Sequence, residues 1–340
     1  MRLWLIFLLL LPVNAFATPL KVVASFSILG DMVHQVGGND IDLKTLVGPN
    51  GDAHVYEPTP ADAKALAAAD LVIINGLSFE GWLGRLIVSS GYTGSIVSAS
   101  DGVKPLEFSG AGMAQDPHAW QNIANAKIYV MNIRDALIKA DGAHAAHYKT
   151  HAEKYLQELD TLDAWVKAQI ASVPNNKREV ITSHDAFQYF GKAYGVRFIA
   201  PQGISTESEA SAADIARLID QIRTQKIQAM FMENISDPRL IKQLETDAGA
   251  YVGGTLYSDA LSPPDGPASD YIAMFRHNVT QLAAGMRHNT RRQHSWRSFN
   301  TLIVIVSSTS RFDFHPQFHP HLIWAVVSNH WTLADKNRSL

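Results

Sequence analysis

The 340-residue chain contains no cysteine, and this absence excludes two kinds of structure. Neither a disulfide framework nor a lipid-bearing N-terminal cysteine is available. Basic residues are also outnumbered, because residues 18–289 contain 22 lysines and arginines against 30 aspartates and glutamates, a formal charge of −8. A nucleic-acid partner requires a basic stripe, so this balance argues against one.

Signatures of catalysis are missing as well. The sequence has no Gly-x-Ser-x-Gly elbow, no His-Glu-x-x-His helix and no glycine-rich phosphate loop. The run Ser183-His184-Asp185 contains the residue types of a hydrolase triad, but adjacent side chains diverge too far to form the proton relay. We therefore expect a protein that is not an enzyme.

Residues 1–17 are organised like an export signal. Arg2 supplies a positive charge, Leu3 to Leu11 form an apolar stretch, and Ala15 to Ala17 match a small-x-small cleavage site. The apolar stretch is too short to span a bilayer. We expect cleavage before Thr18 and a periplasmic protein that carries no lipid anchor.

Short apolar runs alternate with helical segments in both halves of the chain. An uninterrupted run such as Leu71 to Ile74 is typical of a parallel strand buried on both faces. This alternation predicts two lobes built from βα units. Strands are predicted at 21–26, 41–47, 71–76, 95–98, 179–182, 197–199, 228–232 and 251–256.

The middle of the chain is predicted to be helical, at 124–140 and at about 143–172. The second helix has an apolar stripe at helical spacing and would span roughly 40 Å, enough for a stiff connector between lobes. The predicted fold class is α/β, with two lobes of mainly parallel sheets joined by a long rigid helix. The predicted domains are a signal peptide at 1–17, an N-terminal lobe at 18–141, the connector at 142–174, a C-terminal lobe at 175–289 and a tail at 290–340.

The composition of the tail differs from that of the body. Residues 290–340 contain six lysines and arginines, two acidic residues and five of the 14 histidines, with little helical periodicity. The run Leu302 to Val306 is either a strand or an aggregation-prone segment. We expect a poorly ordered appendage, whose His315, His319 and His321 could bind metal weakly.

Four polar residues lie far apart in the sequence but in similar settings. His54, His118, His184 and Asp259 are separated by 64, 66 and 75 residues, and each is expected in a loop after an apolar, strand-like run. Ligands of open α/β sheets bind beyond the carboxyl ends of strands. A single loop histidine is usually just solvated, but the shared setting favours a joint site between two lobes.

The chemistry of this set favours a divalent transition metal. Three imidazoles and one carboxylate suit zinc first, because manganese prefers oxygen ligands. Manganese or iron stays an alternative if Asp259 binds through both oxygens.

A second group of histidines has a simpler interpretation. His144, His147 and His151 form one face of the connector helix and are expected to be an exposed polar stripe.

The segments around the four residues resemble those of the zinc/manganese solute-binding proteins that feed ABC importers (cluster A-I). Further matches are Ile204–Glu209, Phe231–Asn234 and Tyr257–Leu261, and the resemblance covers about residues 21–288. It implies two βα lobes joined by a rigid helix, with the metal buried between them. It also implies that the metal ligands are His54, His118, His184 and Asp259.

Two features depart from the family pattern. Many zinc members have a histidine-rich acidic loop before the second ligand, whereas Glu107 to Gln115 is short and contains no histidine. Manganese members often have glutamate where this chain has His184, so the second feature favours zinc. Glu207 and Glu209 are expected in a solvated loop. The less favoured interpretation is that they contact the membrane permease of the ABC importer.

The sequence thus predicts a monomeric receptor that captures zinc, as transported ligand, and delivers it to the membrane permease of an ABC importer. A manganese or iron receptor of the same family is the first alternative. A secreted zinc-dependent hydrolase is the alternative from another class. Catalytic zinc usually keeps three protein ligands and one open position, whereas four protein ligands close the coordination sphere.

Overall fold

The computed structural model describes residues 18–108, 114–208, 210–225, 227, 229–249 and 251–287. The predicted signal at 1–17 and the whole of the predicted tail at 290–340, including the run at 302–306, lie outside these residues. The predictions for these segments therefore stay predictions.

The first lobe is built on a four-stranded parallel sheet with the strand order β2-β1-β3-β4. The central strand β1 is buried from Val22 to Phe26, as expected for a strand covered on both faces. Val22 pairs with Leu43 on one side and with Leu71 on the other. The strands are β1 (Leu20–Phe26), β2 (Ile41–Val47), β3 (Leu71–Ile74) and β4 (Ser95–Ser98).

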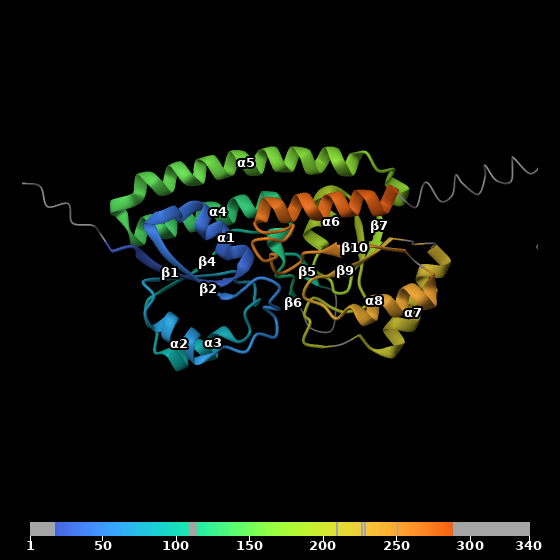
Figure 1. The fold of residues 1–340 in the computed structure, drawn as a ribbon, viewed down its shortest axis with the longest axis horizontal. Coiled ribbons are helices and arrows are strands. Elements are labelled where there is room, and N and C mark those ends of the chain that lie inside the picture. The colour runs from blue at the N-terminus through green and yellow to red at the C-terminus, as the bar shows by residue number, and fades with distance from the viewer. Residues whose placement is uncertain are drawn as a thin grey trace, which may run out of the picture. The chain divides into compact units, whose positions relative to one another are not determined.

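Helices cover both faces of this sheet. In Figure 1, α2 (Pro60–Ala67) and α3 (Leu83–Ser90) lie below it, and α1 (Ser27–Gly37) and α4 (Ile123–Ala140) lie above it. Helix α2 begins with a capping box, in which Asp62 Oδ2 accepts from the Thr59 amide at 2.8 Å and the Asp62 amide donates back to Thr59 Oγ1.

The long helix α5 (Ala145–Ala171) spans both lobes, as predicted (Figure 1). It follows a short 3₁₀ turn, η3 (Gly142–His144), and packs against α1 and α4 of the first lobe and α6 of the second. Near its C-terminal end, the Arg276 guanidinium lies 5.1 Å from the centre of the Trp165 ring. Its buried face consists of Tyr148, Ala152, Tyr155, Leu159, Leu162, Val166 and Ile170.

The second lobe repeats the arrangement of the first. Its parallel sheet has the order β10-β9-β7-β8, so in each lobe the first strand in the chain lies between the second and the third. Its strands are β7 (Glu179–Ile181), β8 (Arg197–Ile199), β9 (Ala229–Glu233) and β10 (Tyr251–Leu256). Its helices are α6 (Gln188–Tyr194), α7 (Ala212–Gln225), α8 (Pro238–Ala248) and a closing helix over 271–287.

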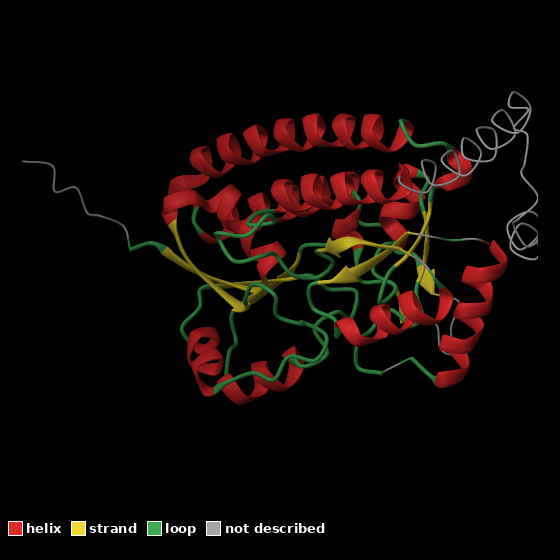
Figure 2. Ribbon diagram, turned by 45° about the vertical axis from the view of Figure 1, so that its right-hand side comes forward, coloured by secondary structure: helices red, strands yellow, loops and turns green. Residues whose placement is uncertain are grey.

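The helices of the second lobe also form two layers. Figure 2 shows α7 and α8 on one side of the sheet and the closing helix on the other, where it faces α5. A small apolar cluster under α7 and α8 includes Ile181, Leu218, Met230, Ile241 and Leu244. A much larger core runs continuously from the first lobe through α5 into the second. The lobes are therefore parts of one packed body.

Strand β10 contains a bulge before it reaches the loop of Asp259. The register against β9 shifts between Val252 and Thr255, at Gly253 and Gly254. Gly254 has a φ of 138°, and a Cβ on Gly253 would lie 2.6 Å from the Phe231 ring. Only glycine fits both positions, so this glycine pair allows the irregular turn of the strand.

Several details differ from the sequence-based expectations. Helix α1 was not predicted from the sequence. The chain also forms a short antiparallel hairpin, β5 (Glu107–Phe108) with β6 (Ala114–Gln115).

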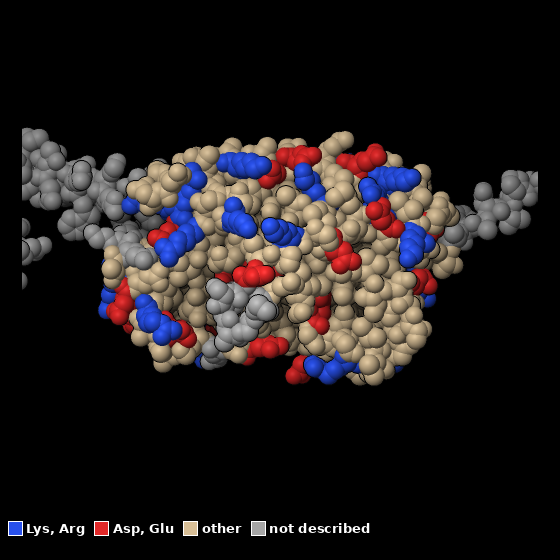
Figure 3. Space-filling view, turned by 180° about the vertical axis from the view of Figure 1, so that it is seen from behind, with Lys and Arg blue, Asp and Glu red and all other residues tan. Residues whose placement is uncertain are grey.

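Within the described residues, no helix has both the length and the apolar character needed to cross a membrane. Lysine and arginine side chains are interspersed with aspartate and glutamate on the face in Figure 3.

Candidate metal centre

His54 lies in the loop that follows β2. The loop is shaped by contacts with both lobes: the Trp82 indole N–H donates to the Ala53 carbonyl at 2.8 Å, and the Asn50 amide donates to the Leu261 carbonyl at 2.9 Å. Asp52 Oδ1 accepts from the His54 amide at 2.9 Å. The imidazole lies edge-on against Phe79, with ring centres 4.8 Å apart, so its orientation is restricted.

His118 reaches the site from a different kind of segment than expected. It follows the β5–β6 hairpin and immediately precedes the 3₁₀ turn η2 (Ala119–Gln121), rather than following a strand of the main sheet. Asp116 Oδ1 accepts from the His118 amide at 2.9 Å and lies 2.8 Å from Nδ1 of its ring. Trp120 packs against the ring, with centres 5.3 Å apart.

His184 follows β7, as the sequence predicted. Glu233, at the end of β9, contacts it twice: Oε1 accepts from the His184 amide at 2.9 Å, and Oε2 lies 2.6 Å from Nδ1. Both side chains are buried. The adjacent positions of β7 and β9 in the sheet bring these two residues together across 49 positions of sequence.

Asp259 follows β10 and enters the site from the second lobe. Its loop is fastened to the first lobe, because the Ser258 carbonyl accepts from the Trp120 indole at 3.0 Å and from the Gln121 amide group at 2.7 Å. The Leu261 amide donates to Ser27 Oγ at 2.9 Å. The carboxylate is thereby carried to the boundary between the lobes.

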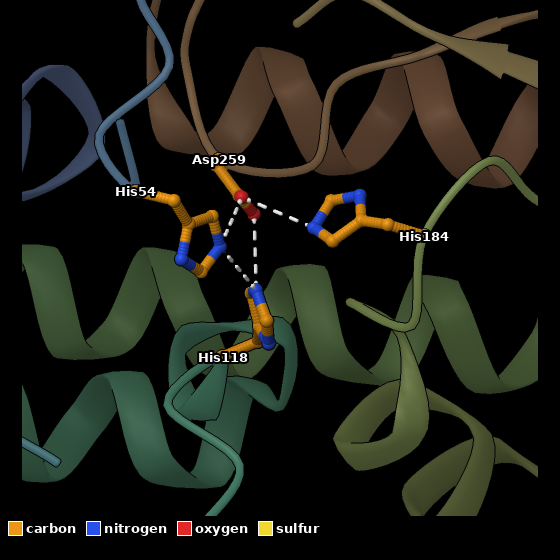
Figure 4. Close-up of side chains that lie close together, drawn as sticks. All are labelled: His54, His118, His184 and Asp259. Carbon is orange, nitrogen blue, oxygen red and sulfur yellow. Dashed lines mark hydrogen bonds and ion pairs between the residues drawn. The ribbon is translucent and has the colours of Figure 1, made fainter. Parts of the chain in front are cut away.

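The four side chains point toward one another (Figure 4), with one ligand atom of each within 4.8 Å of the others. Asp259 Oδ2 lies 3.2 Å from Nε2 of both His54 and His184, and Oδ1 lies 3.6 Å from Nε2 of His118. The Nε2 atoms of His54 and His118 are 3.3 Å apart. His54 is 7% exposed and the other three are fully buried.

The proximity of these groups shifts their pKa values. Burial acts to lower the pKa of His118, but the carboxylates of Asp259 and Asp116 outweigh it and raise the pKa to about 9. Burial opposes protonation of His184 too, yet Glu233 and Asp259 hold its pKa well above the usual value. Burial acts to raise the pKa of Asp259, and the two imidazoles hold it well below its usual range.

The two lobes also meet beside the cluster. Thr206 Oγ1 donates to Asp52 Oδ2 at 2.6 Å, which ties the His54 loop to the second lobe. A cavity of about 520 Å³ borders this contact, and its lining includes Ser183, the neighbour of His184. Thr206 belongs to the segment Ile204–Glu209, in which Glu207 is exposed and Glu209 lies outside the described residues.

The second group of histidines is more engaged than the predicted exposed stripe. His147 is exposed, but its Nδ1 lies 2.8 Å from Asp40 Oδ2. His144 Nδ1 lies 2.6 Å from Asp141 Oδ2, and His151 Nδ1 lies 3.1 Å from the Val36 carbonyl. The His147 and His151 contacts fasten the start of α5 to the end of α1 and the turn after it, whereas the contact of His144 with Asp141 is local.

Sequence reasoning missed the residues that support the cluster. Asp116 stands two positions before His118, a spacing that allows a carboxylate to contact the next histidine. Glu233 belongs to a segment that carried the family resemblance, but nothing in the sequence indicated its partner. Phe79 contacts both His54 and His118, but no pattern in the sequence singled it out.

Two parallel α/β lobes, joined by a long helix and enclosing buried imidazole and carboxylate groups, form the architecture of a substrate-binding protein of an ABC metal transporter. The chain belongs to the ZnuA family, described as zinc-uptake complex component A, periplasmic, whose model matches residues 22–285.

Relatives of the chain are named for different metals. The manganese-binding lipoprotein MntA of Halalkalibacterium halodurans is 34% identical over 268 residues, covering 78% of this chain and 88% of the relative. The iron-binding protein YfeA of Yersinia pestis is 34% identical over 272 residues, covering 79% and 87%. The structure of the periplasmic zinc binding protein TroA from Treponema pallidum matches with a TM-score of 0.76 and 30% identity, covering 79% and 99%.

These names contradict the expected location of the protein. MntA and further relatives from Streptococcus anginosus and Streptococcus pyogenes are named lipoproteins, which indicates attachment to a membrane. We expected an unanchored periplasmic protein from the absence of cysteine. That expectation is wrong: it rested only on the absence of cysteine, whereas these relatives are named lipoproteins.

Proposed function

We propose that His54, His118, His184 and Asp259 bind one divalent transition metal, with zinc as the preferred ion, and that the protein delivers this metal to the permease of an ABC importer. The observation that carries the proposal is the convergence of three Nε2 atoms and one carboxylate in a buried site. Each lobe contributes two of these residues, so metal binding is coupled to the contact between the lobes.

Zinc is preferred because imidazole nitrogen dominates the set and because affinities in such sites rise from manganese to zinc. A manganese or iron receptor is the second candidate, and one observation favours it. Both oxygens of Asp259 face histidine nitrogens, so the carboxylate is placed to bind through two oxygens and enlarge the coordination sphere. The names of MntA and YfeA point the same way.

We further propose that the protein acts as a monomer and not as an enzyme. Four side chains that close a buried site leave little room for a reacting substrate, unlike a catalytic zinc site with its open position. We keep the division into an export segment at 1–17, lobes at 18–141 and 175–289, the connector at 142–174 and the tail at 290–340. Size-exclusion chromatography with light scattering tests the monomer.

The test of the metal site is a titration of purified, chelator-stripped protein with zinc, manganese and ferrous iron under anaerobic conditions. We expect one tight equivalent of zinc and weaker binding of the other two. His118→Ala should abolish tight binding, whereas His147→Ala, which removes an exposed histidine of the other cluster, should retain it. Equal loss in both variants, or no saturable binding in the wild type, would refute the proposal.

A further inference from the structure

We propose that Glu233 is a positioning residue that selects the tautomer of His184, and thereby makes this imidazole a metal ligand. This inference rests on the proposed function. Glu233 ends β9 and is 3% exposed, and each of its oxygens contacts a different nitrogen of the same histidine. Oε1 accepts a hydrogen bond from the backbone amide at 2.9 Å. Oε2 forms an ion pair with Nδ1 at 2.6 Å, a contact that is close but does not have hydrogen-bond geometry.

The chemistry of a carboxylate decides where the ring proton lies. An ionised glutamate can only accept hydrogen bonds, so the nitrogen beside it carries the proton. With the proton on Nδ1, a neutral His184 presents the lone pair of Nε2. This is the atom that lies 3.2 Å from Asp259 and faces the rest of the cluster. In the opposite tautomer an N–H bond would point at the metal position and coordination would be blocked.

Glutamine cannot replace Glu233 in this role, although it has the same shape. Its amide has one acceptor and one donor end, whereas His184 offers two N–H groups. If the carbonyl accepts from the backbone amide, the NH₂ group faces Nδ1 and forces the ring proton onto Nε2. If the amide is turned around, the NH₂ group faces the backbone N–H. Either orientation loses one interaction in a buried site.

The second supported histidine provides a matched control. Asp116 also contacts the amide and Nδ1 of its histidine, His118, but both contacts use the same oxygen, Oδ1. The other oxygen, Oδ2, has no hydrogen-bond partner within the described residues. An asparagine at this position can therefore keep both contacts through its carbonyl. Asp116→Asn and Glu233→Gln remove the same charge, but only Glu233→Gln alters the preferred tautomer.

The experiment measures zinc affinity by chelator competition in the wild type and both variants of the full chain, with circular dichroism to confirm folding. We expect Glu233→Gln to weaken zinc binding by about 10–100-fold, the range known for residues that orient metal ligands. Asp116→Asn should weaken it clearly less. Equal losses in the two variants would overturn the proposal, because charge alone would then explain both.

Nitrogen-15 spectra of histidine-labelled, metal-free protein at alkaline pH provide a readout that does not depend on zinc. In the wild type the His184 proton should lie on Nδ1, and in Glu233→Gln on Nε2. An Nδ1 proton in both proteins would overturn the proposal. If the wild type binds no zinc but the tautomer inverts, the metal-receptor function fails and the positioning role stands. Should Glu233→Gln not fold, Glu233→Asp provides the second variant: it keeps the charge, loses reach, and should bind zinc with intermediate affinity.

Discussion

At the scale of single residues, the site is an array of opposite charges that exists before any metal arrives. Asp259 stabilises the protonated forms of His118 and His184, and these imidazoles in turn stabilise its carboxylate. Protons and metal ions therefore compete for the same nitrogens. The expected pH dependence follows from the direction of these pKa shifts rather than from the usual histidine value.

We predict that zinc affinity rises from pH 6.5 to 9. The pKa of His118 is about 9 in the metal-free protein, so its imidazole is protonated below that pH and zinc binding must displace the proton. Each displaced proton changes the affinity by about tenfold per pH unit. Competition titrations in buffers of constant ionic strength measure this slope. An affinity that levels off above pH 7 would mean that His118 carries no proton there.

The same pKa shifts also affect the stability of the metal-free protein. Between pH 6.5 and 9 this stability should fall as the pH rises, whereas zinc affinity should increase. A pKa raised on folding contributes stability that is complete below the unfolded value of about 6.5 and is lost as pH rises through about 9. The lowered pKa of Asp259 contributes stability above about pH 4, which is lost as pH falls below it. The melting temperature without metal should thus fall between pH 6.5 and 9. Thermal denaturation in the presence of a chelator tests this, and a melting temperature that rises over this range would contradict it.

His184→Glu should shift metal preference toward manganese, because a carboxylate oxygen replaces an imidazole nitrogen. The structure adds a complication, since Glu233 lies 2.6 Å from the ring nitrogen and would face the new carboxylate. We expect the zinc-to-manganese affinity ratio to fall by about tenfold, or ~1.4 kcal/mol. Pairing the change with Glu233→Gln should improve manganese binding by removing the repulsion. An unchanged ratio in both variants would place His184 outside the coordination sphere.

At the scale of elements, the helix α5 was predictable and the helix α1 was not. The apolar stripe of α5 repeats at helical spacing over many turns, so local pattern and burial agree. Helix α1 begins at Ser27 without a side-chain cap, and Gly30 lies within it against Thr45. Its buried residues, including Ile28 and Met32, stabilise it, and their burial requires the assembled lobe.

We predict that Leu162→Ala lowers the free energy of unfolding by about 2–5 kcal/mol, because the side chain is fully buried between α5 and the helices it covers. Thr161→Ala, on the exposed side of the same helix, should change it by less than about 0.5 kcal/mol. Urea denaturation of the metal-free proteins measures both. Zinc affinity should be retained in each, since α5 supplies no ligand. Similar stabilities for the two variants would show that α5 does not carry the shared core.

At the scale of the whole molecule, the site is held closed by contacts that cross between the lobes. The His54 loop is bonded to the second lobe through Asp52 and Thr206, and the Asp259 loop is bonded to the first through Ser258 and Trp120. Each lobe thus holds a ligand loop of the other. If the site holds a metal as proposed, we expect its release to require these contacts to separate.

We predict that removal of residues 290–340 leaves tight zinc binding unchanged. All four candidate ligands precede the tail, and the large core already includes Phe275, Leu282 and Met286 of the closing helix. Loss of the apolar run at 302–306 should also improve solubility. Zinc titration and sedimentation of the shortened and full-length proteins provide the comparison. Abolished tight binding in the shortened protein would mean that the tail belongs to the fold.

The βα order of the two lobes and the long connector followed from the sequence pattern, and the same pattern named four candidate ligands whose metal binding stays a prediction. These features depend on local patterns: apolar runs, helical periodicity, and polar residues just after strands. The placement of His118 after a small hairpin was not determined in this way, because a two-stranded hairpin leaves little pattern.

Long-range packing sets which carboxylates contact the candidate ligands and how the pKa values of these groups shift. Glu233 contacts His184 because β9 lies beside β7, a pairing of strands 49 residues apart that no local pattern encodes. Likewise, the raised pKa of His118 requires Asp259, which arrives from the other lobe. Distances between groups that are remote in sequence are set by packing, and electrostatic interactions depend on those distances.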